Sequence, residues 1–578
     1  MASKELPASG DEYTHDVVEP VECVGLQTRG GWTTFPFITV SALGLSIAAA
    51  GWTTNLIVYL IQKFNIKSIH ATEIYNVVNG CTSFFPIVGA IIADSFVGNY
   101  FVILGSSILS LLGLVLLTLT ATLDSLRPND CKEDLQTCEA SSQFQLAILF
   151  SAITLVSIGI GGTRFTLATM GADQFDKRKN QGTFFNWYFF TFTLATIIGI
   201  TAIVYVEDNV SWGLGYILCL AINAIGLAIF ICGKRYYRHI KPMGSPFTSI
   251  ARVIVATIRK KKVLLSSESK DYYYGDIKGT LFPAVLGLTS RFRFLNRAAM
   301  KVEGDAHQQQ GKLSESWSLC TVQQVEDFKS LIKICPLWSS SIFLHTPIAI
   351  QMSLMVLQAL AMDRHVGPHF RIPSSSFLVF TLLATAIALS IFDRYLFPMW
   401  KKLTHRSMTP LVRIGIGHVL NIIGMACSAL VESRRLHVVR NHNLTHQPSS
   451  VTVTPMSALW LIGPLAIVGV GEAFHFPGQV SLYYQEFPTS LKSTATAMIS
   501  LVIAVAFYLS TALIDLIQRI TGWLPDNINE GRIDNVFWML VIIGVINFGY
   551  YSTCAMLYKY NNVENSEQKS ETLVIDDA

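Results

Sequence analysis

Charged residues are scarce in this sequence, and the short motifs of soluble enzymes are missing. Only 14% of the 578 residues are charged and 51% are hydrophobic, whereas soluble domains carry about 25% charged residues. Ionisable groups cost roughly 2.5–3.5 kcal/mol each on membrane insertion, so a membrane protein explains the deficit. The ten cysteines form no CxxC pair and no Cys/His cluster at metal-ligand spacing. There is no P-loop and no HExxH motif, so we expect no enzyme activity, no cofactor and no metal.

Long apolar stretches are what the sequence has instead, and there are six on each side of one basic segment. Most of them reach the ~20 residues that a helix needs to cross a bilayer. The predicted spans are residues 32–61, 74–94, 101–123, 144–170, 185–205, 212–232, 331–361, 377–392, 411–431, 458–484, 495–516 and 536–558. This pattern predicts an all-α polytopic membrane protein with 12 transmembrane helices in two six-helix bundles.

The domain organisation follows from the same pattern. We expect an N-terminal tail (1–31), an N-terminal bundle (32–232), a basic linker (233–330), a C-terminal bundle (331–560) and a C-terminal tail (561–578). Residues 1–31 lack the apolar run of a cleavable signal peptide, so the first span is expected to direct insertion. The small net charge of +4 gives no indication of a nucleic-acid partner.

The distribution of lysine and arginine predicts the orientation in the membrane. The linker holds 17 of them, and positively charged segments stay in the cytoplasm. We therefore expect the linker and both termini on the cytoplasmic side. The opposite loop, 432–455, has three arginines and departs from this rule. It also holds the sequon Asn443-Leu444-Thr445, and another polar loop holds Cys131 and Cys138, which either form a disulfide outside the cell or stay free.

Within the linker, residues 245–262 alternate apolar and basic side chains. This pattern predicts an amphipathic helix that lies either on the anionic inner leaflet or in solvent as a linker helix. Residues 266–310 are polar and irregular, and we expect them to be disordered.

Two charged residues lie in the middle of predicted spans, Arg164 in the fourth and Glu472 in the tenth. An intramembrane charge usually faces a cavity and has a partner. The simplest interpretation is an ion pair across a central cavity, where carriers place their sites between the two halves. The alternative is a static pair that holds two helices together. Gly159, Gly161 and Gly162 fit either a site near Arg164 or ordinary helix packing.

Three further polar residues are candidates for the site. His475 follows Glu472 by one helical turn, and His345 and Gln351 lie in the seventh span. Together with Arg164 they offer hydrogen-bond donors to a small anion. Packing inside the bundle is the alternative for each histidine.

Several motifs resemble the plant nitrate/peptide transporter family, which belongs to the proton-dependent oligopeptide transporters of the major facilitator superfamily. The resemblance covers nearly the whole chain. Its markers are NLIVYL at 55–60, GADQFD at 171–176, FFNWY at 184–188, MDR at 362–364, Asp393-Arg394 and Gly471-Glu472-Ala473. The resemblance implies two bundles with alternating access. It also implies that Arg164 stands where the family usually has a lysine, and that Glu472 is its ion-pair partner.

The sequence departs from that family in its first span. Proton-coupled members carry an ExxER motif there, and the corresponding stretch is Ala42-Leu43-Gly44-Leu45-Ser46. Asn99 also replaces a basic residue that is usual in the loop after the second span. The loss of ExxER resembles the nitrate excretion branch, whose members release nitrate, or in some cases chloride, at the plasma membrane.

The leading hypothesis is therefore efflux of a small anion, nitrate first, with weak or no proton coupling. Arg164 would attract the anion, and Glu472 would pair with Arg164 when the site is empty. The alternatives are transport of chloride or of a small organic solute such as a peptide or hormone, and a membrane sensor that transports nothing. The lipid bilayer is the only other expected partner, and the sequence does not indicate an oligomeric state.

Overall fold

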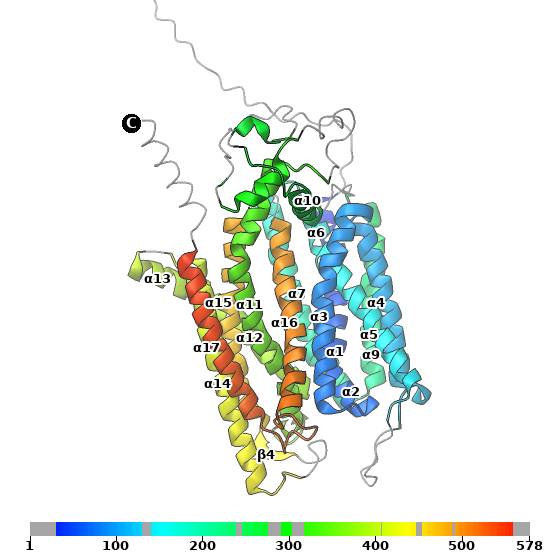
Figure 1. Cartoon of the computed structure of the whole chain (residues 1–578). Helices are drawn as coiled ribbons and strands as arrows, with labels where there is room; N and C mark the ends of the chain where they lie inside the picture. Colours follow the sequence, from blue (N-terminus) through cyan, green and yellow to red (C-terminus); the bar gives the residue numbers. More distant parts are fainter. Residues whose placement is uncertain are drawn as a thin grey trace, which may run out of the picture.

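The computed structural model describes residues 30–129, 140–238, 246–266, 268–275, 289, 291–302, 317–405, 407–446, 453–487 and 492–558. Most of both predicted tails, and both Cys131 and Cys138, lie outside these residues. Within them, 12 helices are long and apolar enough to cross a membrane. They form two bundles that stand side by side, the first from the blue-to-cyan half of the chain and the second from the green-to-red half (Figure 1). The predicted fold class is confirmed.

The N-terminal bundle contains six spans, three of which are interrupted. Its helices are α1 (Phe35–Thr54), α2 (Leu56–Phe64), α3 (Ser68–Ile92), α4 (Asn99–Thr122), α5 (Gln143–Arg164), α6 (Thr166–Ala172), α7 (Arg178–Ile198), α8 (Val204–Asn209) and α9 (Trp212–Cys232). The first predicted span is thus two helices, separated at Asn55, whose backbone leaves the helical range at ψ 7°. A π-helical turn, Gly199–Ile203, joins α7 to α8.

The C-terminal bundle also contains six spans. Its helices are α11 (Val322–Leu360), α12 (Leu378–Ile391), α13 (Phe397–Thr404), α14 (Pro410–Asn441), α15 (Ile462–Glu486), α16 (Lys492–Ile520) and α17 (Ile533–Leu557). Four short strands accompany them: β1 (Met362–Asp363) pairs with β4 (Thr454–Ser457), and β2 (His365–Val366) pairs with β3 (Phe370–Arg371). With 39 residues, α11 begins before the boundary expected at 331 and extends beyond the bundle.

Local sequence explains where the long helices start. Ser142 and Gln145 form a reciprocal capping box at the start of α5, and Thr321 and Gln324 do the same for α11. Each box satisfies two backbone N–H groups that have no partner within the helix. Pro410 at the first position of α14 needs no such partner, because proline has no N–H.

The linker contains the helix α10 (Pro246–Arg259), as the alternating pattern predicts. Its side chains Val253 and Ala256 are fully buried against Leu295, Ala298 and Cys320 of the linker itself. This side of the helix is therefore covered by protein, whereas Ile254 and Ile258 are 41% and 62% exposed. Whether the exposed side faces the inner leaflet or solvent stays a prediction. Ordered structure in part of residues 266–310 also corrects the expected disorder: this small core includes the 3-10 helix Arg293–Ala299.

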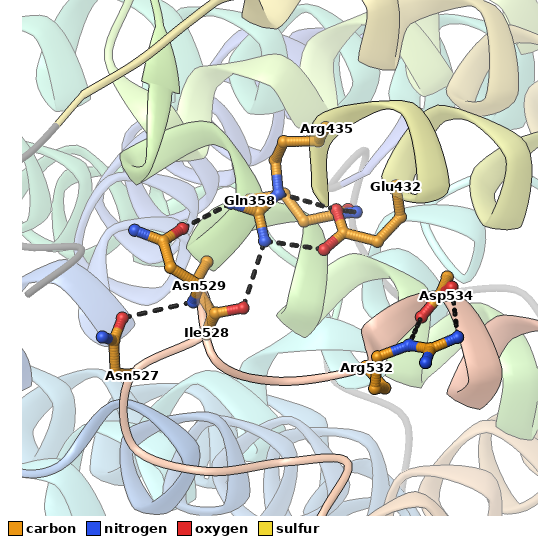
Figure 2. A network of polar contacts seen from close by, with 8 residues as sticks. All are labelled: Gln358, Glu432, Arg435, Asn527, Ile528, Asn529, Arg532 and Asp534. Carbon is orange, nitrogen blue, oxygen red and sulfur yellow. Dashed lines mark hydrogen bonds and ion pairs between the residues drawn. The ribbon is translucent and has the colours of Figure 1, made fainter. Parts of the chain in front are cut away.

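Residues 432–441 belong to α14 rather than to a loop, and all three arginines that depart from the orientation rule lie in this helix. Arg435 and Glu432 are both fully buried and form a bidentate ion pair, with Nη2–Oε1 and Nε–Oε2 distances of 2.7 and 2.9 Å. Figure 2 shows how Gln358 and Asn529 complete the network from α11 and from the segment before α17. One of the three arginines is thus a buried, neutralised group.

Polar contacts between the bundles gather at the end away from the linker and at mid-height. Arg364 contacts Asp208 with an Nη1–Oδ2 distance of 3.3 Å. Ser375 and Ser376 donate from the short helix Ser374–Phe377 to Asn55 Oδ1 and to the Ile200 carbonyl, at 3.0 and 2.7 Å. Deeper in the membrane, the Ser500 hydroxyl donates to the Ser83 carbonyl at 2.8 Å. The contacts of Arg364, Ser375 and Ser376 close the two bundles against each other on the side opposite the linker, and the contact of Ser500 joins them at mid-height.

Candidate transport site

Arg164 is the last residue of α5, at a break that separates this helix from α6. The residue after it, Phe165, is the C-cap of α5 and the N-cap of α6, and its carbonyl accepts from the Thr169 N–H at 2.9 Å. The break lies about two-thirds of the way along the fourth span, Gln143–Ala172. Protein atoms surround the Arg164 side chain, and yet its surface is open to solvent-sized molecules. From these two properties we infer that Arg164 lines an internal space.

The glycine run before Arg164 serves helix packing. A Cβ on Gly159 would lie 2.5 Å from the Ser110 nitrogen of α4, and one on Gly161 would lie 2.3 Å from the Phe85 Cβ of α3. Real Cβ atoms do not approach so closely, so these glycines allow α5 to lie against both neighbours. Of the two interpretations that the sequence left open, the structure supports packing.

The neighbours of Arg164 are aromatic. Its guanidinium lies 5.6 Å from the centre of the Phe192 ring, and Tyr188 of the same helix, α7, is close enough to interact electrostatically. No carboxylate of the described residues lies within ion-pair distance of Arg164. The expected ion pair with Glu472 is therefore absent from this conformation. The positive charge of Arg164 is not neutralised by a carboxylate of the described chain and can attract an anionic ligand.

Glu472 faces a histidine instead. Its Oε2 atom lies 3.8 Å from His345 Nε2, so α15 and α11 meet at this point. His475 lies on the same side of α15, and its ring centre is 5.1 Å from that of His345. Gly417 makes this possible, because a Cβ there would lie 2.7 Å from the His475 Cβ. The structure thus brings together three of the five predicted site residues.

Gln351 is not part of this group. It is buried and donates from Nε2 to the Ser428 hydroxyl of α14 at 2.8 Å. Within the described chain it stabilises the contact of α11 with α14. No sequence signal distinguishes these two roles, because a glutamine in an apolar helix looks the same whether it lines a cavity or bridges two helices.

Sequence reasoning missed the residues that close the side opposite the linker. Asp208 and Arg364 lie at the ends of spans, where charged residues are common and do not indicate a site. The buried pair of Glu432 and Arg435, which belongs to the C-terminal bundle alone, did carry a signal, since residues three apart on a helix share a face. That signal was hidden because the ninth span was expected to end at residue 431.

The fold and this site define a membrane carrier built from two six-helix bundles. Residues 100–530 match the family model described as "POT family". The chain is 51% identical to Protein NRT1/ PTR FAMILY 2.3 and 54% identical to Protein NRT1/ PTR FAMILY 2.7, both from Arabidopsis thaliana. These matches cover 94% and 93% of the chain and 95% of each relative. The chain therefore belongs to the POT family, with NRT1/PTR proteins as its relatives, and it is a transporter rather than an enzyme.

Solved structures agree with this fold. An auto inhibited POT family peptide transporter matches with a TM-score of 0.67 and 16% identity, over 92% of this chain and 98% of the other. The POT family transporter PepTSo matches with a TM-score of 0.65 and 15% identity, over 91% and 99%. At this identity the likeness establishes the shared fold and says nothing about the cargo.

Proposed function

We propose that this protein carries a small inorganic anion, nitrate first, out of the cell across the plasma membrane by alternating access, with weak or no proton coupling. The observation that carries this proposal is the state of Arg164. It is a cation at mid-membrane, open to solvent-sized molecules and without a carboxylate partner in the described chain. A charge in this position is costly unless it faces a water-filled space and a counter-ion. A small anion is that counter-ion.

The first span supports the absence of strong proton coupling. The stretch that lacks ExxER packs directly on α9: a Cβ on Gly44 would lie 2.9 Å from the Ile222 carbonyl. One residue before it, Ser41 donates to the Gly226 carbonyl at 2.9 Å. The face that touches α9 has neither an ionisable group nor room for one, so no proton can be exchanged there.

Direction follows from the membrane potential. One elementary charge moving across the membrane is worth about 2.3 kcal/mol per 100 mV. A plant cell is negative inside, so an anion leaves downhill and needs no proton, whereas uptake needs one.

The observed conformation fits the loading step of this cycle. The bundles are joined on the side opposite the linker, and we place this side outside the cell. In this conformation Arg164 would bind an anion that enters from the cytoplasm. Binding would neutralise Arg164, and the bundles would then rock to open outward. On the return, Glu472 would pair with Arg164 and replace the released anion.

The proposal is tested by nitrate efflux from proteoliposomes that contain purified protein. We expect Arg164→Gln to lower the nitrate efflux rate at least tenfold, because the positive charge that attracts the anion is lost. The matched control is Arg434→Gln: Arg434 is exposed on α14 beside Trp460 and far from the site. Undiminished efflux in Arg164→Gln would exclude Arg164 from the mechanism, and stronger competition by chloride or a dipeptide than by nitrate would change the cargo.

A further inference from the structure

Three side chains in the C-terminal bundle converge on one point without satisfying one another. One ligand atom from each of His345, Glu472 and His475 lies within 4.8 Å of the others. Two of them come from α15 and one from α11. His475 is fully buried and His345 is 7% exposed.

Each of these side chains has a buried polar atom without a hydrogen-bond partner in the described chain: His345 Nε2, Glu472 Oε1 and His475 Nδ1. Buried polar atoms are normally paired, because an unmade hydrogen bond in the interior is unfavourable. Unpartnered atoms on three side chains whose ligand atoms converge indicate a missing partner that accepts electron pairs from this group.

The tautomer of His345 shows what kind of partner fits. Its Nδ1 lies 2.9 Å from the Ser341 carbonyl, which can only accept, so Nδ1 carries the proton. In a neutral ring the Nε2 lone pair then faces the Glu472 carboxylate, with 3.8 Å between Nε2 and Oε2. These two electron-rich atoms repel each other unless a cation, either a proton or a metal ion, lies between them. A backbone carbonyl that fixes the ring through its other nitrogen is the usual support of a metal-binding histidine.

The donor set selects the type of cation. Two imidazoles and one carboxylate suit zinc and similar transition metals, while Mg²⁺ and Ca²⁺ prefer oxygen ligands. Bonds of about 2.0–2.2 Å in tetrahedral geometry place the ligand atoms roughly 3.4 Å apart. Small side-chain rotations bring the three atoms to that spacing. The Glu472 side chain is 15% exposed, which leaves an open side for entry and for a fourth ligand.

We propose that His345, Glu472 and His475 form a binding site for one divalent transition-metal ion of the zinc class. The site itself does not depend on which solute is transported. Its effect does rest on the proposed function: a metal-bound Glu472 cannot pair with Arg164. The empty carrier then returns slowly, so the metal inhibits net nitrate efflux. Nitrate–nitrate exchange is unaffected, because the anion site at Arg164 stays occupied throughout exchange.

The binding test uses the purified full-length protein, stripped with a chelator and titrated with ZnCl₂ and with CoCl₂. We expect one ion per chain, a rise in the melting temperature, and the visible absorption of tetrahedral Co²⁺. Each of His345→Gln, Glu472→Gln and His475→Gln should weaken binding at least tenfold. Three variants are used because any one of them alone can reduce folding.

The matched control is His70→Ala. His70 is an exposed histidine on α3 whose Nδ1 lies 2.8 Å from Glu73, so it offers the same types of ligand outside the proposed site. Binding that is lost in His70→Ala, or that survives all three site variants, would overturn the proposal. So would the absence of stoichiometric binding, which would mean that the cluster holds only a proton. If the metal binds but leaves net efflux unchanged, the metal site stands and the role of Glu472 in the return step is wrong.

Discussion

Arg364 of the C-terminal bundle and Asp208 of the N-terminal bundle form an ion pair whose side chains are only 4% and 10% exposed. Arg364 lies directly after β1, and Asp208 lies in α8. The pair therefore crosses the boundary between the bundles on the side opposite the linker. It is suited to hold that side closed, because an outward-open state must separate the two charges.

Breaking this pair should open the side opposite the linker. Removing one partner of a buried ion pair typically costs 3–5 kcal/mol, since the other charge is left uncompensated. We expect Asp208→Asn to increase the outward-open population at least tenfold. The measurement is the rate at which an impermeant thiol reagent modifies a cysteine introduced at Ser375, with Asp208→Arg/Arg364→Asp as the control that restores the pair. An unchanged rate would show that the pair does not hold the closed state.

The buried pair of Glu432 and Arg435 should matter for stability rather than for gating, because all its partners belong to the C-terminal half of the chain (Figure 2). We expect Glu432→Gln to lower the free energy of unfolding by about 3–5 kcal/mol, measured as a lower melting temperature in detergent. The exposed neighbour provides the control: Arg434→Gln should leave the melting temperature unchanged. Equal melting temperatures for both variants would contradict the structural role.

The two bundles also touch where α3 meets α16. A Cβ on Gly80 would lie 2.8 Å from the Tyr508 ring, so only glycine permits this approach. Gly80→Val should push the bundles apart there and reduce nitrate efflux severalfold. Gly105→Val on α4 is the matched control, because a Cβ at Gly105 meets no atom within 4 Å. Normal efflux in Gly80→Val would mean that this contact does not constrain the rocking motion.

Asp173, just after α6, should make stability depend on pH. Burial raises its pKa to about 6, the nearby charge of Asp94 adds to this, and the Asn99 amide, 3.2 Å away, opposes it. The folded-state pKa lies above the usual 3.8. The contribution of Asp173 to stability is therefore complete below pH 3.8, is lost as the pH rises from 3.8 through about 6, and does not change further above that.

We expect Asp173→Asn to remove this dependence and to stabilise the protein above pH 6 by up to about 3 kcal/mol. Asn99→Lys should act in the same direction by supplying the basic group that this loop lacks. Melting temperatures between pH 5 and 8 give the measurement. Asp176→Asn is the control and should not stabilise, because a hydrogen bond from Arg238 lowers the pKa of Asp176. A loss of stability in Asp173→Asn at pH 8 would contradict this account.

Much of the fold was predictable because lipid imposes a strong and simple rule on sequence. Helices that span the membrane must be long and apolar, so their number and their division into two sets were visible. The break at Asn55 was not predictable, because the apolar stretch continues from α1 into α2 without interruption. The extension of α14 was hidden because Glu432 and Arg435 look like loop charges until they are paired.

The sequence allowed candidate residues to be named for the site, and it did not indicate which of them face one another. Arg164 and Glu472 are conspicuous because charges are rare in membrane helices. Which groups they face depends on helix rotation and on the conformational state, which local sequence does not set. The partnership of Glu472 with His345 joins residues that are distant in the chain, and only the packing of α11 on α15 reveals it.

We propose that Arg164 binds the transported anion and that no proton accompanies it. One measurement tests this directly. The current–voltage relation of the protein is recorded with nitrate and with chloride at two external pH values, alongside Arg164→Gln. The account predicts a nitrate current that depends on Arg164 and whose reversal potential follows the nitrate gradient and ignores external pH. Inward nitrate movement against its gradient on external acidification, with a matching proton current, would contradict it.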